Sequence, residues 1–311
     1  MVLNKISCSF KAAIVGCGSV GASAAYAYVL DGSVTQMALV DIDEDKAAGL
    51  RLDLEHASTF TPNMQIDSSD DLSICQGANI VVISAGARQK EGESRLDLCL
   101  KNKKIYANII PQIAKAAPNA ILIIVSNPVD VLTYEAIKLS GFPKERVFGT
   151  GTVLDSIRLQ FHISEQLQIH PSSIYAHVLG EHGDTSFPMF SSANVLGKSL
   201  FDFDNFSSEV ADKCYEDTKL AAYRVIHDQG YTCYSIATVI REITNSIFED
   251  KKQVFTLSVP LDNYYGNSDV CLSVPCVLGR GGVEQVLKVP LSKQEQEQLK
   301  TSCDSLKPFL N

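Results

Sequence analysis

A glycine-rich turn near the start of the chain constrains the fold more than any other feature. Residues 16–21, Gly-Cys-Gly-Ser-Val-Gly, match the pattern G-x-G-x-x-G. The turn follows a short apolar run and opens an alanine-rich segment that is compatible with a helix. An acid, Asp41, lies twenty residues after Gly21, at the end of the next apolar run. Strand, turn, helix and acid together predict a βαβ unit that binds a dinucleotide.

Each part of this motif has a physical task. Gly16 allows the tight turn, Gly18 lets a pyrophosphate approach the backbone, and Gly21 lets the helix pack against the strand. The N-terminus of the helix supplies N–H groups and positive potential for the phosphates. Asp41 would accept hydrogen bonds from the adenosine ribose hydroxyls, and its charge would repel a 2′-phosphate. We therefore predict NAD, rather than NADP, as the cofactor.

Apolar runs alternate with helix-type segments through the first half of the chain. We expect strands at 12–15, 37–40, 79–84 and 121–126. We expect helices at 22–30, 44–56 and 96–117. Apolar strands that alternate with helices are typical of a buried parallel sheet. The sequence therefore predicts an α/β fold with a Rossmann-type, doubly wound parallel sheet.

The second half has the pattern of an α+β substrate domain. We expect helices at 153–167, at 209–248 with a break at Gly230, and at 293–310. Strands of an antiparallel kind are expected at 255–259, 270–277 and 286–289, after a strand at 174–179. A boundary near residues 149–151 would divide the chain into an NAD-binding domain, residues 1–150, and a catalytic and oligomerisation domain, residues 151–311.

Composition narrows the classes of function. Lys and Arg number 27 against 36 Asp and Glu, a net charge of −9, so we expect no nucleic acid partner. No stretch reaches the roughly 18 apolar residues of a membrane span, and the N-terminus lacks the apolar core of a signal peptide. The nine cysteines form no C-x-x-C pair. We therefore expect a cytoplasmic protein with reduced thiols and no metal site.

Four further segments carry polar residues where a uniform core would not place them: 85–95, 126–130, 155–158 and 180–184. The first two directly follow apolar strands, and ligands bind at the carboxyl ends of strands in open sheets. Each segment alone has an ordinary explanation. They could be a solvated loop, a turn before Pro128, a surface pair of Asp155 with Arg158, or a structural His182.

In combination, these segments resemble the L-lactate/malate dehydrogenase family, and more closely its L-lactate dehydrogenases. The matching motifs are the glycine turn, the loop 89–95, Ser-Asn-Pro at 126–128, Asp-Ser-Ile-Arg at 155–158 and Gly-Glu-His-Gly-Asp at 180–184. The resemblance runs from about residue 12 to the C-terminus and includes Gly-Tyr-Thr at 230–232. It implies reversible, NADH-dependent reduction of pyruvate to L-lactate, a reaction of glycolysis and fermentation.

The resemblance also implies roles for the polar residues. His182 would be the general acid/base, with Asp155 holding its other ring nitrogen. Arg158 would bind the substrate carboxylate through a bidentate fork, which Lys cannot supply. Arg95 would close over the substrate and polarise its carbonyl group.

Further positions match residues of the family that contact the substrate or the cofactor. Asn127 would hydrogen-bond near the carbonyl oxygen and the nicotinamide ribose, its peptide bond to Pro128 being cis. Thr232 would line the substrate pocket. The other cofactor contacts would be Val20, Lys46, Gly86, Ala87, Arg88, Val125 and Ser126.

Two alternatives compete with lactate dehydrogenase activity. Malate dehydrogenases of this family share the catalytic groups named above, but they carry Arg six residues before the loop Arg, to pair with the second carboxylate of oxaloacetate. This chain has Gln89 there, which disfavours oxaloacetate because a buried charge would stay unpaired. A catalytically silent structural protein on the same fold is the other alternative. The presence of the four expected catalytic residues argues against it: His182, Asp155, Arg158 and Arg95.

The family resemblance also bears on assembly and regulation. Its members are usually tetramers, so we expect a homotetramer. Many bacterial members bind fructose 1,6-bisphosphate through an Arg and a His at a subunit interface. Gln160 and Tyr175 stand at those two positions here and cannot supply the cationic charge. We therefore do not expect fructose 1,6-bisphosphate to be an activator.

Overall fold

The computed structural model describes residues 10–87, 92 and 95–310. One sheet of nine strands organises them, in the order β13-β12-β11-β6-β5-β4-β1-β2-β3. Its parallel strands are β1 (Lys11–Val15), β2 (Gln36–Val40), β3 (Gln65–Ser69), β4 (Ile80–Ile83), β5 (Ile121–Ile124) and β6 (Val147–Gly149). Its antiparallel strands are β11 (Gln253–Pro260), β12 (Cys271–Gly279) and β13 (Gly282–Val286).

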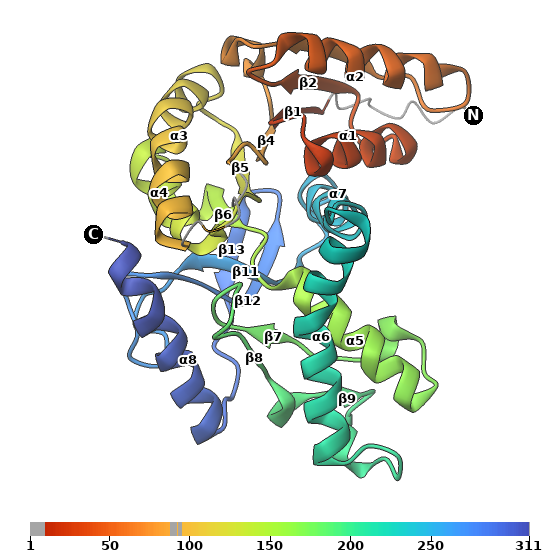
Figure 1. The fold of residues 1–311 in the computed structure, drawn as a ribbon, viewed down its shortest axis with the longest axis vertical. Coiled ribbons are helices and arrows are strands. Elements are labelled where there is room, and N and C mark those ends of the chain that lie inside the picture. Colours follow the sequence, from red (N-terminus) through yellow and green to blue (C-terminus); the bar gives the residue numbers. More distant parts are fainter. Residues whose placement is uncertain (1–9, 88–91, 93–94, 311) are drawn as a thin grey trace, which may run out of the picture.

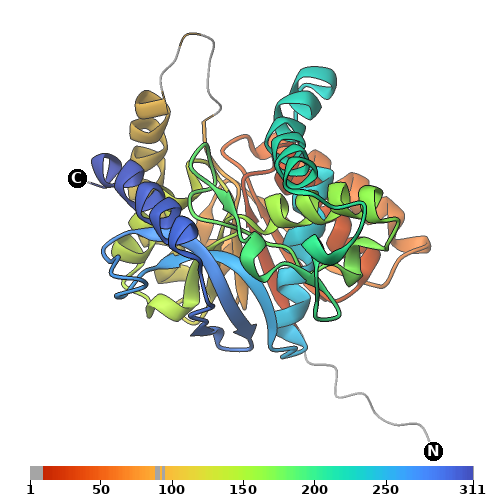
Figure 2. The same cartoon turned by 90° about the horizontal axis from the view of Figure 1, so that it is seen from below.

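Helices cover both faces of this sheet and build the second half. In the first half they are α1 (Ser19–Asp31), α2 (Glu44–His56), α3 (Arg95–Ala116) and α4 (Val129–Ser140). In the second half they are α5 (Val153–Leu167), α6 (Ser208–Gln229), α7 (Tyr234–Phe248) and α8 (Lys293–Leu306). Two small hairpins pair β7 (Val178–Leu179) with β8 (Phe187–Pro188), and β9 (Asn194–Val195) with β10 (Lys198–Ser199). The first of these hairpins lies between α6 and α8 (Figure 1, Figure 2).

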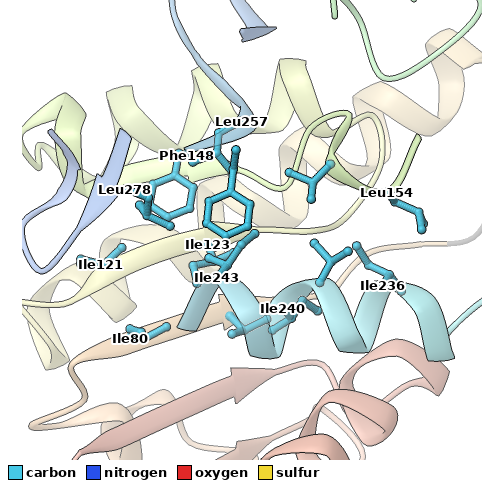
Figure 3. Close-up of a cluster of buried hydrophobic side chains, with 14 of the residues drawn as sticks. Ile80, Ile121, Ile123, Phe148, Leu154, Ile236, Ile240, Ile243, Leu257 and Leu278 are labelled. Carbon is cyan, nitrogen blue, oxygen red and sulfur yellow. The ribbon is translucent and has the colours of Figure 1, made fainter. Parts of the chain in front are cut away.

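Alternate residues of the parallel strands build two separate hydrophobic cores. Ile80 and Val82 of β4 belong to a cluster with residues of α1 and α7, whereas Val81 and Ile83 belong to one with α3 and α4. Figure 1 shows these two pairs of helices on opposite sides of the strands, and Figure 3 shows Ile240 of α7 close to the sheet. The period of two in a strand explains this division, because successive side chains point to opposite faces. The predicted doubly wound α/β fold is confirmed.

The sequence pattern does not predict three elements of the first half, β3, β6 and α4. β3 has the polar sequence Gln-Ile-Asp-Ser-Ser, which an edge strand tolerates because one side of it stays open to water. The strand β6 spans only three residues, too few for a periodic signal. The helix α4 begins directly after the polar turn at 126–128, which obscures its start.

In the second half, several helices and strands have other boundaries than the sequence predicts. The strand expected at 286–289 is wrong: β13 spans Gly282–Val286, because the hairpin pairs Gly279 with Gly282 and the strand starts at the turn. The strand expected at 174–179 shrinks to β7, with one isolated bridge from Tyr175 to Asn194. The expected break at Gly230 is confirmed, since this residue ends α6 with a φ of 84°. The last helix ends at Leu306, followed by a 3-10 turn.

Candidate active site

The glycine turn forms a cradle at the carboxyl end of β1. A Cβ atom at Gly16 would lie 2.5 Å from the backbone nitrogen of Ala85, and one at Gly21 would lie 1.9 Å from the carbonyl oxygen of Gly16. Both glycines are therefore required by packing within the chain. A Cβ atom at Gly18 would meet no heavy atom within 4 Å among the described residues. Open space at this position, beside the N-terminus of α1, fits the approach of a pyrophosphate.

The structure brings Asp41 to this turn. Its Oδ2 accepts a hydrogen bond from the backbone nitrogen of Cys17 at 2.6 Å and one from Nζ of Lys46 at 3.2 Å. Its Oδ1 accepts a hydrogen bond from the backbone nitrogen of Asp43 at 3.1 Å. A carboxylate is thus held at the end of β2, next to the glycine turn, as binding of an adenosine ribose requires. Val20 lies in the first turn of α1, half-buried against the core.

The ends of β4 and β5 are tied together by a residue that the sequence pattern does not reveal. Asn102 of α3 is 1% exposed. Its Oδ1 accepts a hydrogen bond from the backbone nitrogen of Ala87 at 2.7 Å, and its Nδ2 donates one to the carbonyl oxygen of Asn127 at 2.7 Å. Asn102 thereby joins two loops that the resemblance assigns to the cofactor. A polar residue on the buried face of a helix is the signal, and only the packing shows which face is buried.

Neighbouring residues complete this edge of the sheet. The hydroxyl of Ser126 donates a hydrogen bond to the carbonyl oxygen of Ala85 at 2.6 Å. A Cβ atom at Gly86 would come within 3.3 Å of Cβ of Ser126, so the two loops approach closely. Val125 is half-buried against the core. The peptide bond between Asn127 and Pro128 is cis, which confirms that expectation.

The three charged residues of the expected catalytic group meet in the second half. Nδ1 of His182 lies 2.7 Å from Oδ2 of Asp155, and Nη1 of Arg158 lies 3.4 Å from Oδ1 of the same carboxylate. Asp155 and Arg158 lie one turn apart on α5, whereas His182 lies in the loop after β7. An ionised Asp155 accepts the Nδ1 proton, which leaves Nε2 for a substrate.

Electrostatics at this group favours a charged imidazole. Burial lowers the pKa of His182, but Asp155 more than offsets this through its charge and hydrogen bond, so the pKa is raised to about 8. Burial also acts to raise the pKa of Asp155, yet the attraction of His182 holds it below its usual value. The arrangement therefore holds a proton on the ring near neutral pH, where a general acid needs it.

Several expected site residues lie elsewhere or outside the described residues. Thr232 lies half-buried between α6 and α7, and no hydrogen bond within the described part of the chain links it to the catalytic group. Arg88 and Gln89 fall outside the described residues. Arg95 begins α3. A residue left without a role by the sequence, Asp130 of α4, contacts the backbone nitrogen of His182 at 2.8 Å.

Two searches of the described residues bear on other kinds of site. No cluster of three or more His, Cys, Asp or Glu side chains there is arranged to hold a metal ion. None of the helices within 10–87 and 95–310 combines the length and apolar character needed to cross a membrane.

Comparison with known families and structures identifies the two halves. Residues 10–149 match the lactate/malate dehydrogenase NAD binding domain, and residues 152–311 match the lactate/malate dehydrogenase alpha/beta C-terminal domain. The first match gives NAD as the cofactor.

Individual relatives cover almost the whole chain. An L-lactate dehydrogenase of Clostridium botulinum strain Hall is 43% identical over 310 residues, covering 97% of this chain and 96% of the relative. One of Acetivibrio thermocellus is 40% identical over 308 residues, covering 96% of each chain.

Two solved structures superpose closely on this chain. A lactate dehydrogenase from a Medee basin deep-sea metagenome library has a TM-score of 0.93 at 38% identity, covering 97% of this chain and 98% of its own. A minor L-lactate dehydrogenase from Enterococcus mundtii has a TM-score of 0.93 at 33% identity, with the same coverage. Sequence, fold and site geometry agree, and the chain is a member of the lactate/malate dehydrogenase family.

Proposed function

We propose that this chain is an L-lactate dehydrogenase, which interconverts pyruvate and L-lactate with NAD. The observation that carries the proposal is the contact of His182 with Asp155 at 2.7 Å, with Arg158 on the other oxygen of that carboxylate. The relatives and solved structures with which the chain shares its length are named lactate dehydrogenases, which supports the same reaction. We further propose that residues 1–150 bind the cofactor and residues 151–311 bind the substrate.

The chemistry divides between the cofactor and three side chains. When bound, NADH supplies a hydride for the carbonyl carbon of the substrate. Protonated His182 donates its Nε2 proton to the carbonyl oxygen, and Asp155 stabilises the imidazolium and holds the ring in place. Arg158 binds the substrate carboxylate with its planar guanidinium. In lactate oxidation the neutral ring accepts the proton instead.

Cofactor binding would use the first half alone. The turn 16–21 would face the pyrophosphate and Asp41 the adenosine ribose, with Val20 and Lys46 beside them. The ends of β4 and β5 would contact the nicotinamide half, through Gly86, Ala87, Arg88, Val125, Ser126 and Asn127. Asn102 and the hydroxyl of Ser126 brace these two strand ends, which supports a shared binding surface.

Substrate choice would depend on the loop 88–95 and on Thr232. We propose that Arg95 polarises the carbonyl group and that Gln89 faces the methyl group of pyruvate. Malate dehydrogenase activity is less consistent with a neutral Gln89, because oxaloacetate would bring a second carboxylate without a partner.

Absorbance of NADH tests the proposal directly. The purified chain, mixed with NADH and pyruvate, should lose the nicotinamide absorbance band as NADH is oxidised. Oxaloacetate under the same conditions should react more slowly. Faster reduction of oxaloacetate would indicate a malate dehydrogenase, and no reaction with either would indicate a catalytically silent member of the family.

The charge of Asp41 should decide the preference for NADH over NADPH. Asp41→Ser removes the repulsion of a 2′-phosphate, while Lys46, now without its carboxylate partner, can attract that phosphate. We expect the ratio of kcat/KM for NADH to that for NADPH to fall at least about tenfold, or roughly 1.4 kcal/mol. Adding Lys46→Ala should reverse part of this gain. Equal kcat/KM for both cofactors in the wild type would contradict the role of Asp41.

We propose a cytoplasmic homotetramer. Ile157 and Phe161 on α5, and Tyr223 and Ile226 on α6, are exposed large apolar side chains. Soluble monomers rarely expose extended apolar patches, so these helices are candidates for subunit contacts. Analytical ultracentrifugation would measure the assembly.

Fructose 1,6-bisphosphate should leave pyruvate saturation unchanged. Tyr175 is 57% exposed and carries no cationic charge. Gln160 donates a hydrogen bond from Nε2 to the carbonyl oxygen of Ala176 at 3.0 Å, which engages its amide within the fold. Saturation curves at neutral pH, with and without millimolar effector, should superpose. A several-fold drop in half-saturation would show that another basic cluster binds the phosphates.

A further inference from the structure

A second carboxylate lies beside His182, on its main-chain side. Asp130 belongs to the first turn of α4 and is 2% exposed. Its Oδ2 accepts a hydrogen bond from the backbone nitrogen of His182 at 2.8 Å. Its Oδ1 accepts one from the hydroxyl of Ser258, on β11, at 2.6 Å. Asp130 therefore joins the catalytic loop to a helix of the first half and to a strand of the second.

The surroundings of Asp130 offer no fixed counter-charge. No salt bridge within residues 10–87, 92 and 95–310 reaches this carboxylate, and both of its hydrogen-bond donors are neutral. Glu181 faces it with a like charge, and burial keeps the thiol of Cys271 on β12 neutral by raising its pKa far above the usual value. Burial raises the pKa of Asp130 to about 6. The hydrogen bonds from Ser258 and from the backbone of His182, and then the through-space charge of the protonated His182 ring, offset part of this rise.

The charges around His182 determine how strongly Asp130 affects the protonation of its ring. From α5 the ring faces the carboxylate of Asp155 and the guanidinium of Arg158, and from α4 it faces Asp130. The two groups of α5 have opposite charges and partly cancel. Burial lowers the pKa of His182, and Asp155 is the largest cause acting against it. Asp130 adds to the effect of Asp155, whereas Arg158 opposes both with a smaller contribution. A buried carboxylate without a fixed partner is stabilised when the ring becomes a cation.

We infer that Asp130 is a positioning residue of the reaction, an inference that rests on the proposed function. It holds the main chain of His182 and favours the protonated ring over the neutral one. It thereby sets the pH around which the rates of pyruvate reduction and lactate oxidation change. Reduction needs the protonated ring and oxidation the neutral ring, so loss of the carboxylate charge should move the midpoints of both pH profiles to lower pH together.

Asp130→Asn tests the charge with little change of shape, because the amide oxygen can still accept the hydrogen bond of the His182 backbone. Starting from about 8, the pKa of His182 should fall by roughly one pH unit, the lower range for a neighbouring opposite charge. The midpoints of the pH profiles of kcat/KM for pyruvate and for lactate should then both move from about pH 8 to about pH 7, while the ratio of the two values at each pH stays fixed by the reaction equilibrium. A purely structural role would lower both kcat/KM values and leave the midpoints of the pH profiles unchanged.

Glu295→Gln is the matched control. Glu295 of α8 is 5% exposed and accepts hydrogen bonds from the backbone nitrogen and hydroxyl of Ser191, at 3.0 and 2.6 Å. The substitution likewise neutralises a buried carboxylate that binds a backbone N–H and a serine hydroxyl. Because it lies outside the candidate active site, the pH dependence in both directions should match that of the wild type.

Ser258→Ala provides a second route if Asp130→Asn fails to fold. It keeps the charge of Asp130 but removes a hydrogen bond that stabilises the ionised carboxylate, so the pH profile should shift in the same direction by less. Folded variants with the pH profile of the wild type would overturn the inference while the proposed function stood. A wild-type chain that does not reduce pyruvate would overturn both.

Discussion

His182→Asn removes most pyruvate reduction, with kcat falling roughly 10²- to 10⁴-fold, the usual contribution of a positioned general acid. Asparagine can still donate a hydrogen bond to Asp155, so the surrounding geometry should persist. It cannot deliver a proton to the carbonyl oxygen. NADH affinity should stay within about twofold, because the ring belongs to the substrate side of the site. Steady-state kinetics and the fluorescence of bound NADH measure the two quantities separately.

His162→Asn is the matched control for this change. His162 lies on α5, with its Nδ1 3.7 Å from Oε2 of Glu165. Its substitution should leave kcat unchanged. If His182→Asn lost NADH affinity, and turnover fell only by the same factor as that affinity, His182 would support the fold rather than the reaction.

Gln89→Arg should shift the substrate preference from pyruvate toward oxaloacetate. A guanidinium can pair with the second carboxylate of oxaloacetate, whereas with pyruvate it would face a methyl group. The binding free energy changes by about 3 kcal/mol or more when a buried charge gains or loses its partner. The ratio of kcat/KM for oxaloacetate to that for pyruvate should therefore change at least roughly a hundredfold. Assays with both substrates at saturating NADH measure this ratio.

Gln89→Lys separates charge from geometry. Lysine brings a positive charge without the planar fork that binds a carboxylate bidentately, so the gain with oxaloacetate should be smaller than with arginine. If neither variant gained activity with oxaloacetate, position 89 would not face the second carboxylate and the reason for preferring pyruvate would be lost.

Most features of the nucleotide-binding half could be predicted from local sequence patterns. Apolar runs of four or five residues marked β1, β4 and β5, because a strand buried on both faces must be apolar throughout. The glycine pattern located the turn after β1, and Asp41 followed at the end of β2, where the structure places it against Cys17. Local chemistry suffices here, since a βαβ unit is built from neighbours in the chain.

The catalytic group came from the sequence only through the family resemblance. His182 and Asp155 are separated by 27 positions, and no periodic pattern places them 2.7 Å apart. Motif spacing transferred their roles, and the fold then brought the two side chains together from the loop after β7 and from α5.

The remaining features depend on how the elements pack in three dimensions. The antiparallel strands join the parallel sheet through the pairing of Ser258 with Gly149, so both halves share one sheet rather than two. Asn102 and Asp130 acquired their contacts from that packing, with partners 25 and 52 residues away along the chain. Edge strands, long-range pairing and buried polar contacts depend on which surfaces meet in space. Side-chain periodicity does not predict which elements pack together. It indicates only whether each face of an element is buried or exposed, and not which element covers it.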